Sequence, residues 1–144
     1  MIKILDSMSP NMKLVLSILQ DEIDGNTKAA LGKMHPGYSM TWMFKAKSGE
    51  FFPSSRPDFT AELAEAYAIT GREYDIKHIT EAADTIFVEL IESYPDPASG
   101  EVFHTPLVLV LEIEDGKIKT GRHYCDPDIS YAHLSAEQIK KAFK

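Results

Sequence analysis

The sequence predicts an α+β domain with a mostly antiparallel sheet. Helical patterns fill most of the first half of the chain, whereas four segments with strand character follow one another in the second half. Parallel strands need helical crossovers between them, so consecutive strands without crossovers favour antiparallel pairing. The dipeptide Asp115-Gly116 between two of these segments is typical of a tight hairpin turn and supports the same arrangement.

The first half begins with a helix that ends in a break. Ser9 can accept a hydrogen bond from a free backbone N–H, and Pro10 lacks the N–H that would otherwise go unpaired, so the two residues suit a helix start. Apolar residues at helical spacing then predict one buried stripe, made of Met12, Val15, Leu16, Leu19 and Ile23. Residues 24–26 break this helix, and residues 27–33 predict a short second one.

A strand and a third helix follow. Large side chains alternate with others over residues 38–44, which predicts a strand with one buried face. Residues 47–57 have the composition of a loop. Ser55 and Pro57 can open a helix whose apolar stripe includes Leu63 and Tyr67, and Gly71 ends it.

The second half predicts four strands and a last helix. Residues 74–81 and 84–94 form one predicted hairpin, and residues 102–114 and 117–125 form another. Ser135 and Gln138 have the spacing of a capping box, which predicts a short helix that runs to Phe143.

Length and charge restrict the function classes. The 144 residues fit a single domain over residues 1–144, and 15 Lys and Arg against 22 Asp and Glu give a net charge of −7. This charge opposes binding to nucleic acid and to anionic membranes. The apolar run at residues 107–111 is far shorter than the ~20 residues of a membrane helix. The N-terminus lacks the order of a signal peptide, so we expect a cytoplasmic location.

Cysteine and histidine content gives little support for a metal or a disulfide. Cys125 is the single cysteine, so no internal disulfide can form, and we interpret it as a small buried thiol. His123, Cys125 and His133 offer soft ligand atoms, but their spacing is not that of a known chelating motif. We therefore expect neither a bound metal nor a cofactor.

Two stretches carry a resemblance to a known family. Residues 23–42 read as a helix end, the break Asp-Gly-Asn, a short helix and an aromatic strand. Residues 114–118 (Glu-Asp-Gly-Lys-Ile) and 122–127 (Arg-His-Tyr-Cys-Asp-Pro) read as a last hairpin with a closing tyrosine-x-aspartate. This order resembles the nuclear transport factor 2-like superfamily, which includes ketosteroid isomerase, limonene epoxide hydrolase and the SnoaL-like polyketide cyclases. The resemblance implies a curved sheet wrapped around the N-terminal helices as a cone, with a pocket at the open end.

The catalytic candidates lie on the last predicted strand. If Ile118 faces the core and no bulge intervenes, strict alternation places Arg122, Tyr124 and Asp126 on the same face. The resemblance to SnoaL-like cyclases implies that Asp126 is an acid/base. If the chain is an enzyme, we expect Tyr124 and Arg122 to stabilise developing negative charge. In the alternative interpretation, Asp126 caps the turn that Pro127 begins.

Two other activities of the family fit less well. In ketosteroid isomerase an acidic general base lies early in the first strand region, where this chain has Thr41 and Trp42. Limonene epoxide hydrolase has an aspartate, arginine, aspartate arrangement. Arg122 and Asp126 can supply two of its members, but no second inward aspartate is evident.

A group of large side chains predicts the apolar part of the pocket. They are Trp42, Met40, Phe44, Met34 and Tyr67. Each of them taken alone is better explained as part of the core. His78 shares an alternating face with Tyr74 and Ile76, so it can reach the pocket as a base, although a lone histidine on such a face is more often only hydrogen-bonded.

The sequence leaves two functions open. One is a cofactor-independent isomerase, cyclase or hydrolase that acts on a small apolar molecule by acid/base chemistry. The alternative is a non-catalytic ligand-binding or dimerisation domain.

A homodimer is the expected assembly. In residues 102–114 one face holds leucines, yet Val108 and Val110 on the opposite face are also apolar. Phe87 and Ile91 can extend this outer patch. Exposed apolar patches usually mark interfaces, so we expect a two-fold homodimer with Val108 and Val110 near its centre.

Overall fold

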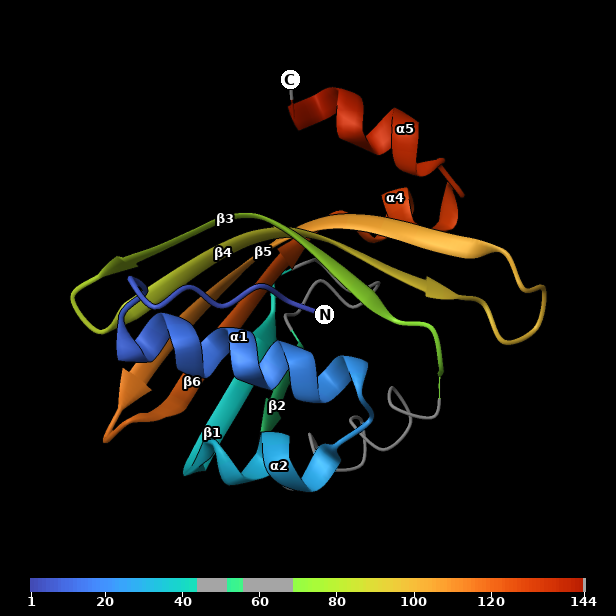
Figure 1. Cartoon of the computed structure of the whole chain (residues 1–144). Helices are drawn as coiled ribbons and strands as arrows, with labels where there is room; N and C mark the ends of the chain where they lie inside the picture. Colours follow the sequence, from blue (N-terminus) through green and yellow to red (C-terminus); the bar gives the residue numbers. More distant parts are fainter. Residues whose placement is uncertain (44–51, 56–68, 144) are drawn as a thin grey trace.

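A computed structural model describes residues 1–43, 52–55 and 69–143 of the chain. A six-stranded sheet in the order β2-β1-β6-β5-β4-β3 curves around the two N-terminal helices (Figure 1). The elements are α1 (Pro10–Ile23), α2 (Thr27–Gly32), β1 (Met34–Trp42), β2 (Phe52–Ser55), β3 (Glu73–Ala82), β4 (Thr85–Pro95), β5 (Val102–Glu114), β6 (Lys117–Cys125), α4 (Pro127–Tyr131), α5 (Ala136–Lys140) and the 3-10 turn η1 (Lys141–Phe143). The predicted α+β class is confirmed.

Helix α1 packs its apolar stripe against the concave face of the sheet. The side chain of Ser9 accepts a hydrogen bond from the Met12 N–H at 3.1 Å, and Pro10 opens the helix. The core between helix and sheet consists mainly of aliphatic side chains, among them Val15, Leu16, Leu19, Ile86, Val88, Leu90, Leu109 and Ile118. The helix and its buried face agree with the prediction.

Most strand pairs are antiparallel, as predicted. Within the described ranges β3, β4, β5 and β6 pair antiparallel in sequence order, and β1 pairs parallel to β6. Both residues of the Asp115-Gly116 turn have positive φ angles, 52° and 69°. These angles match the right-handed twist of the flanking strands, which is why this dipeptide marks the hairpin.

Residues 52–55 form a strand that the sequence analysis did not predict. They were expected in a loop, but they pair antiparallel with β1 as an edge strand, with Pro53 opposite Thr41. Proline is tolerated in an edge strand because one side of the strand needs no ladder hydrogen bond. The predicted third helix falls mostly on residues 56–68, outside the described residues.

Two β-bulges change which side chains face the concave side. Ile76 pairs with Leu90 and His78 with Glu89, so Lys77 is an extra residue in β3. Likewise Ile118 pairs with Ile113 and Thr120 with Glu112, so Lys119 is an extra residue in β6. An extra residue shifts the two-residue alternation by one, so the side chains that follow it change face.

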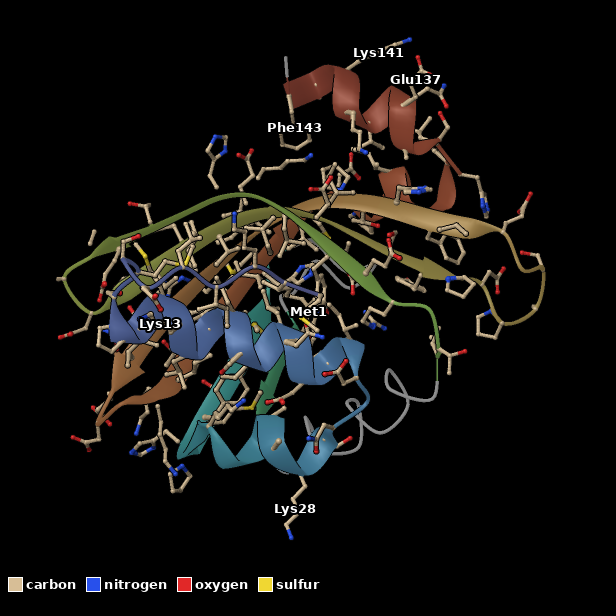
Figure 2. The ribbon with its side chains drawn as sticks, viewed as in Figure 1. Met1, Lys13, Lys28, Glu137, Lys141 and Phe143 are labelled. Carbon is tan, nitrogen blue, oxygen red and sulfur yellow. The ribbon has the colours of Figure 1, made fainter. Side chains whose placement is uncertain are left out.

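The C-terminal segment lies on the convex side of the sheet, opposite α1 and α2 (Figure 1). Ser135 and Gln138 form the predicted capping box at the start of α5. Phe143 points towards the sheet, with Lys77 Nζ 5.6 Å from its ring centre, whereas Glu137 and Lys141 point away from the sheet (Figure 2). No helix in the described ranges is long and apolar enough to cross a membrane.

Candidate functional site

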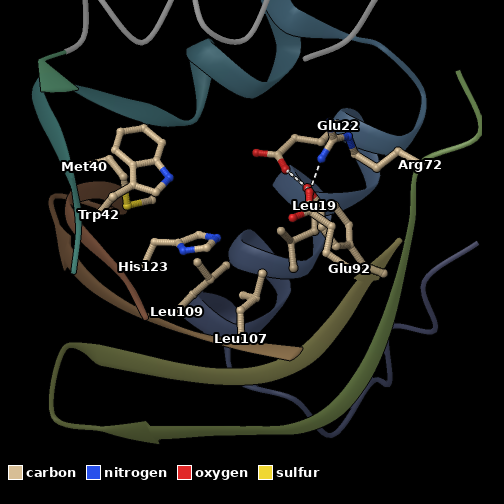
Figure 3. A pocket seen from close by; sticks show the side chains of 10 residues that line it. Leu19, Glu22, Met40, Trp42, Arg72, Glu92, Leu107, Leu109 and His123 are labelled. Carbon is tan, nitrogen blue, oxygen red and sulfur yellow. Dashed lines mark hydrogen bonds and ion pairs between the residues drawn. The ribbon is translucent and has the colours of Figure 1, made fainter. Parts of the chain in front are cut away.

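A cavity of about 210 Å³ lies between the end of α1 and the concave face of the sheet (Figure 3). Its apolar walls are Leu19, Met40, Trp42, Leu107 and Leu109. Its polar lining consists of Glu22, Arg72, Tyr74, Glu92 and His123. A largely apolar cavity with a few converging polar groups has the character of a small-molecule site.

The polar group on one side of the cavity comes from three elements. Glu22 lies in the last turn of α1, three residues after Leu19, so it continues the buried face of the helix beyond the apolar stripe. Arg72 directly precedes β3. Tyr74 in β3 is opposite Glu92 in β4, so both side chains reach the concave face from neighbouring strands.

Hydrogen bonds join these four side chains into one cluster. The Tyr74 hydroxyl donates to Glu22 Oε2 at 2.5 Å and lies 3.5 Å from Glu92 Oε1. Arg72 Nη1 forms an ion pair with Glu92 Oε1 (Figure 3). Arg72 is also held above the ring of Tyr94, with Cζ 4.9 Å from the ring centre. We call Glu22, Arg72, Tyr74 and Glu92 the acid cluster.

Burial governs the ionisation of the acid cluster. Burial raises the pKa of Glu22 from 4.5 to about 7, and the charge of Glu92 acts in the same direction, although the hydrogen bond from Tyr74 opposes it. Burial also raises the pKa of Glu92, against the attraction of Arg72. The pKa of the Tyr74 hydroxyl is raised well above its usual value, chiefly by burial, so it remains a hydrogen-bond donor. Glu22 is therefore the member of the cluster that can exchange a proton near neutral pH.

His123 faces the acid cluster from the other side of the cavity. Figure 3 places His123 with Trp42 and Met40 across from Glu22. The ring centres of Trp42 and His123 are 6.4 Å apart. Burial lowers the pKa of His123 from 6.5 to about 4, so the imidazole is neutral at physiological pH. Its Nδ1 is buried and finds no hydrogen-bond partner among the described residues.

The three residues expected to be catalytic do not line this cavity. Tyr124 is 40 % exposed, and Arg122 Nη1 lies 3.6 Å from Glu112 Oε2 in a partly exposed pair. Asp126 caps α4, where its side chain accepts a hydrogen bond from the Asp128 N–H at 3.0 Å. The expectation that these side chains share a face with Ile118 is wrong, because the bulge at Lys119 turns Arg122 and Tyr124 to the convex side.

Only some of the predicted ligand-binding residues line the cavity. Met40 and Trp42 line the cavity, whereas Met34 is 2 % exposed within the core. Phe44 and Tyr67 lie outside the described residues. The side chain of His78 is 80 % exposed and contacts Glu89, with 2.6 Å between Nδ1 and Oε2. The expectation that His78 shares a face with Tyr74 is wrong because of the bulge at Lys77.

The sequence interpretation missed the acid cluster and His123. One signal was available for Glu22, because it follows Val15 and Leu19 by seven and three residues and so falls on the apolar stripe. A carboxylate in such a stripe is uncommon without a partner. No local signal indicates Arg72 or Glu92, since each depends on the pairing of β3 with β4.

One group of side chains in the described part of the chain has the arrangement of metal ligands. It consists of His35, Glu114 and Asp115 near the β5–β6 turn. Lys119 Nζ is 3.2 Å from Glu114 Oε2 and 3.2 Å from His35 Nδ1, so an ammonium group already lies among these atoms. None of the three residues lines the cavity.

Comparison with known proteins identifies the fold. No family model matches the chain. No curated protein matches its sequence. Among solved structures, IdmH of Streptomyces antibioticus, described as "a putative polyketide cyclase", has a TM-score of 0.72 at 12% identity over 86% of this chain and 97% of its own.

Two further structures are similar over most of their length. An LEH-like epoxide hydrolase of M. tuberculosis has a TM-score of 0.69 at 13% identity over 93% of this chain and 96% of its own. An NTF2-like protein of unknown function from Cytophaga hutchinsonii has a TM-score of 0.62 at 13% identity over 86% of this chain and 96% of its own. The chain therefore has the cone-shaped α+β fold of the nuclear transport factor 2-like superfamily.

Proposed function

We propose that this chain is a cofactor-independent enzyme that moves a proton on a small, largely apolar molecule, with Glu22 as the acid/base. The observation that carries the proposal is the Glu22 carboxyl group, which lines an apolar cavity and is hydrogen-bonded to Tyr74. Its pKa of about 7 populates both protonation states near neutral pH. A general acid or base is most effective when its pKa lies near the working pH.

The neighbours of Glu22 each have a supporting role in the proposed reaction. The Tyr74 hydroxyl orients the carboxyl group and stabilises its ionised form through the 2.5 Å hydrogen bond. Arg72 neutralises Glu92, so a second negative charge close to Glu22 is balanced. The walls formed by Leu107, Leu109 and Trp42 exclude water from an apolar substrate.

Such a site suits reactions that need only proton transfer. Isomerisation, ring closure by a carbanion and addition of water each begin when a base removes a proton from carbon or from water. The polyketide cyclase description and the epoxide hydrolase among the structures of similar fold support this class of chemistry.

The alternative is a non-catalytic ligand-binding domain. One observation favours it: the acid cluster ties the end of α1 to β3 and β4, which is also what a purely structural network would do. In that case Glu22 stabilises the fold and performs no turnover.

A reactive probe separates the two functions. Nitrobenzisoxazole opens when a carboxylate removes one C–H proton, and the coloured phenolate product reports the rate. We expect catalysis that rises with pH through a midpoint near 7, because only ionised Glu22 accepts the proton. Glu22→Gln should lower the rate at least about 100-fold.

The matched control is Glu137→Gln on the exposed side of α5, which should leave the rate unchanged. An equal rate in wild type and Glu22→Gln would assign the acid cluster to structure and favour the ligand-binding alternative.

A further inference from the structure

The cavity has polar groups at two opposite sides with apolar walls between them. The acid cluster lies on one side, and the ring of His123 enters from β6 on the other (Figure 3). Trp42, Leu107 and Leu109 contribute the walls. A ligand that fills this space is therefore met by a polar group at each end and by hydrocarbon in the middle.

His123 can act towards a ligand either as a hydrogen-bond donor or as a hydrogen-bond acceptor. A neutral imidazole has one donor and one acceptor nitrogen, and the partner of one nitrogen normally decides what the other presents. The Nδ1 atom of His123 is buried without a partner among the described residues. No described side chain therefore fixes the tautomer, and the ring can donate to a carbonyl oxygen or accept from a hydroxyl group.

The side chains that line the cavity carry almost no net charge when Glu22 is protonated. Arg72 and Glu92 pair with each other, and both His123 and protonated Glu22 are neutral. An anionic ligand would meet no free cation among the described lining residues, and the chain as a whole carries a charge of −7. Burying an unpaired ion in apolar surroundings is costly, so an uncharged ligand fits best.

We propose that the cavity takes an uncharged molecule with two oxygen-bearing polar groups at the ends of a short apolar body, and that His123 is the specificity residue for the end remote from Glu22. The proposal rests on the cavity being the ligand site proposed above. Its volume of about 210 Å³ suits one ring with two short substituents, since an apolar cavity of roughly 150 Å³ accommodates benzene.

A series of aromatic ketones tests the proposal by binding alone. Dissociation constants are measured by NMR titration at about pH 6, where Glu22 is mostly protonated. The probes are acetophenone, para-(hydroxymethyl)acetophenone, para-acetylbenzoate and para-acetylbenzylammonium. We expect the alcohol to bind wild type about tenfold or more tightly than acetophenone, and more tightly than either ion, because His123 meets its hydroxyl group.

Variants assign the preference to one end of the cavity. His123→Phe should bind acetophenone as wild type does, which shows that it is folded, and should lose the preference for the alcohol. His123→Gln, which keeps a hydrogen-bonding group near the position of Nε2, should retain part of the preference. Glu22→Gln should retain it fully, since Glu22 serves the other end.

The outcomes distinguish this inference from the proposed function. Absence of the preference in wild type, an equal preference in His123→Phe, tighter binding of either ion, or no saturable binding of the ketones would overturn the assignment of His123. If the preference depends on His123 while Glu22→Gln leaves the nitrobenzisoxazole rate unchanged, the binding inference stands and the proposed catalysis fails.

Discussion

The hydroxyl of Tyr74 donates a hydrogen bond to the carboxyl group of Glu22, which lies 52 positions earlier in the chain. This contact links the C-terminal turn of α1 to the start of β3 and closes one side of the cavity. The carboxyl group of Glu22 thereby connects α1 to β3, and it is also the most readily titrated group of the acid cluster.

Glu22 should make the stability of the fold depend on pH. Its folded pKa of about 7 exceeds the 4.5 of an unperturbed glutamate, so the folded state binds a proton that the unfolded state releases. The stabilisation is complete below about pH 4.5 and is lost as the pH rises through 7, by up to about 3 kcal/mol. Urea unfolding of wild type and Glu22→Gln over this range should show a difference in unfolding free energy that changes with pH. A constant difference would contradict the buried proton.

His123 should show the opposite dependence. Its folded pKa of about 4 lies below the usual 6.5, so the unfolded state binds the proton more readily. Stability from the neutral ring is present above about pH 6.5 and is lost as the pH falls towards 4. NMR of the ring should place the midpoint near 4, and a midpoint near 6.5 would show that the ring is solvated.

Removing only one partner of the ion pair between Arg72 and Glu92 should lower the unfolding free energy strongly. Arg72→Met leaves the Glu92 carboxylate buried without its cation, so we expect a loss of about 3 kcal/mol in unfolding free energy. Replacing both residues by Met should recover at least half of that loss. Arg122→Met is the control, because its pair with Glu112 is partly exposed and should cost less than about 1 kcal/mol. Equal losses in the two single variants would argue against a buried pair.

Gly121 should control the size of the cavity through Met40. A Cβ atom at position 121 would lie 2.8 Å from Met40 Cε and Sδ, so the end of the Met40 side chain must move. Because Met40 lines the cavity, Gly121→Ala should weaken acetophenone binding several-fold, and Gly121→Ala with Met40→Ala should restore it. Gly32→Ala meets no atom within 4 Å and serves as the control. Unchanged affinity in Gly121→Ala would place the ligand elsewhere.

The two-fold homodimer expected from the sequence stays a prediction. Tyr124 and Phe87, which pair with Val108 and Val110 in the sheet, are 40% and 38% exposed. Val110 and Ile91 are only 9% and 4% exposed, so the expectation that these two residues belong to an exposed outer patch is wrong. Tyr124→Lys places a charge in this patch and should shift sedimentation towards the monomer. Val102→Lys, at an exposed position at the start of β5, should not. A wild-type chain that is monomeric at high micromolar concentration would contradict the assembly.

The fold was predictable because its signals are local. The stripe that begins at Met12, the cap at Ser9 and the positive φ angles required at Asp115-Gly116 depend on neighbouring residues only. Strand β2 was missed because Pro53 usually argues against a strand, and only its place at the sheet edge makes it acceptable.

The site was less predictable because it depends on register. Alternation predicts which face a side chain lies on only up to the first bulge. No feature of Lys77 or Lys119 distinguishes them in the sequence from the other lysines of the chain. Beyond each bulge the faces predicted for His78, Arg122 and Tyr124 were reversed. Met40 and Trp42 were placed correctly since they lie on β1, where alternation continues through residues 39–42.

The bulge at Lys119 also has a consequence for how such proteins diverge. Because Lys119 is the extra residue, loss of its single codon would leave Thr120 opposite Glu112, so Arg122 and Tyr124 would stay on the convex side and His123 would stay in the cavity. One insertion or deletion at this position would thus change the length of the strand without changing the side chains that a ligand meets. Within this cone, a bulge lets a strand gain or lose one residue while the cavity lining is kept, whereas the same change taken up as a shift of register would turn every later side chain to the other face.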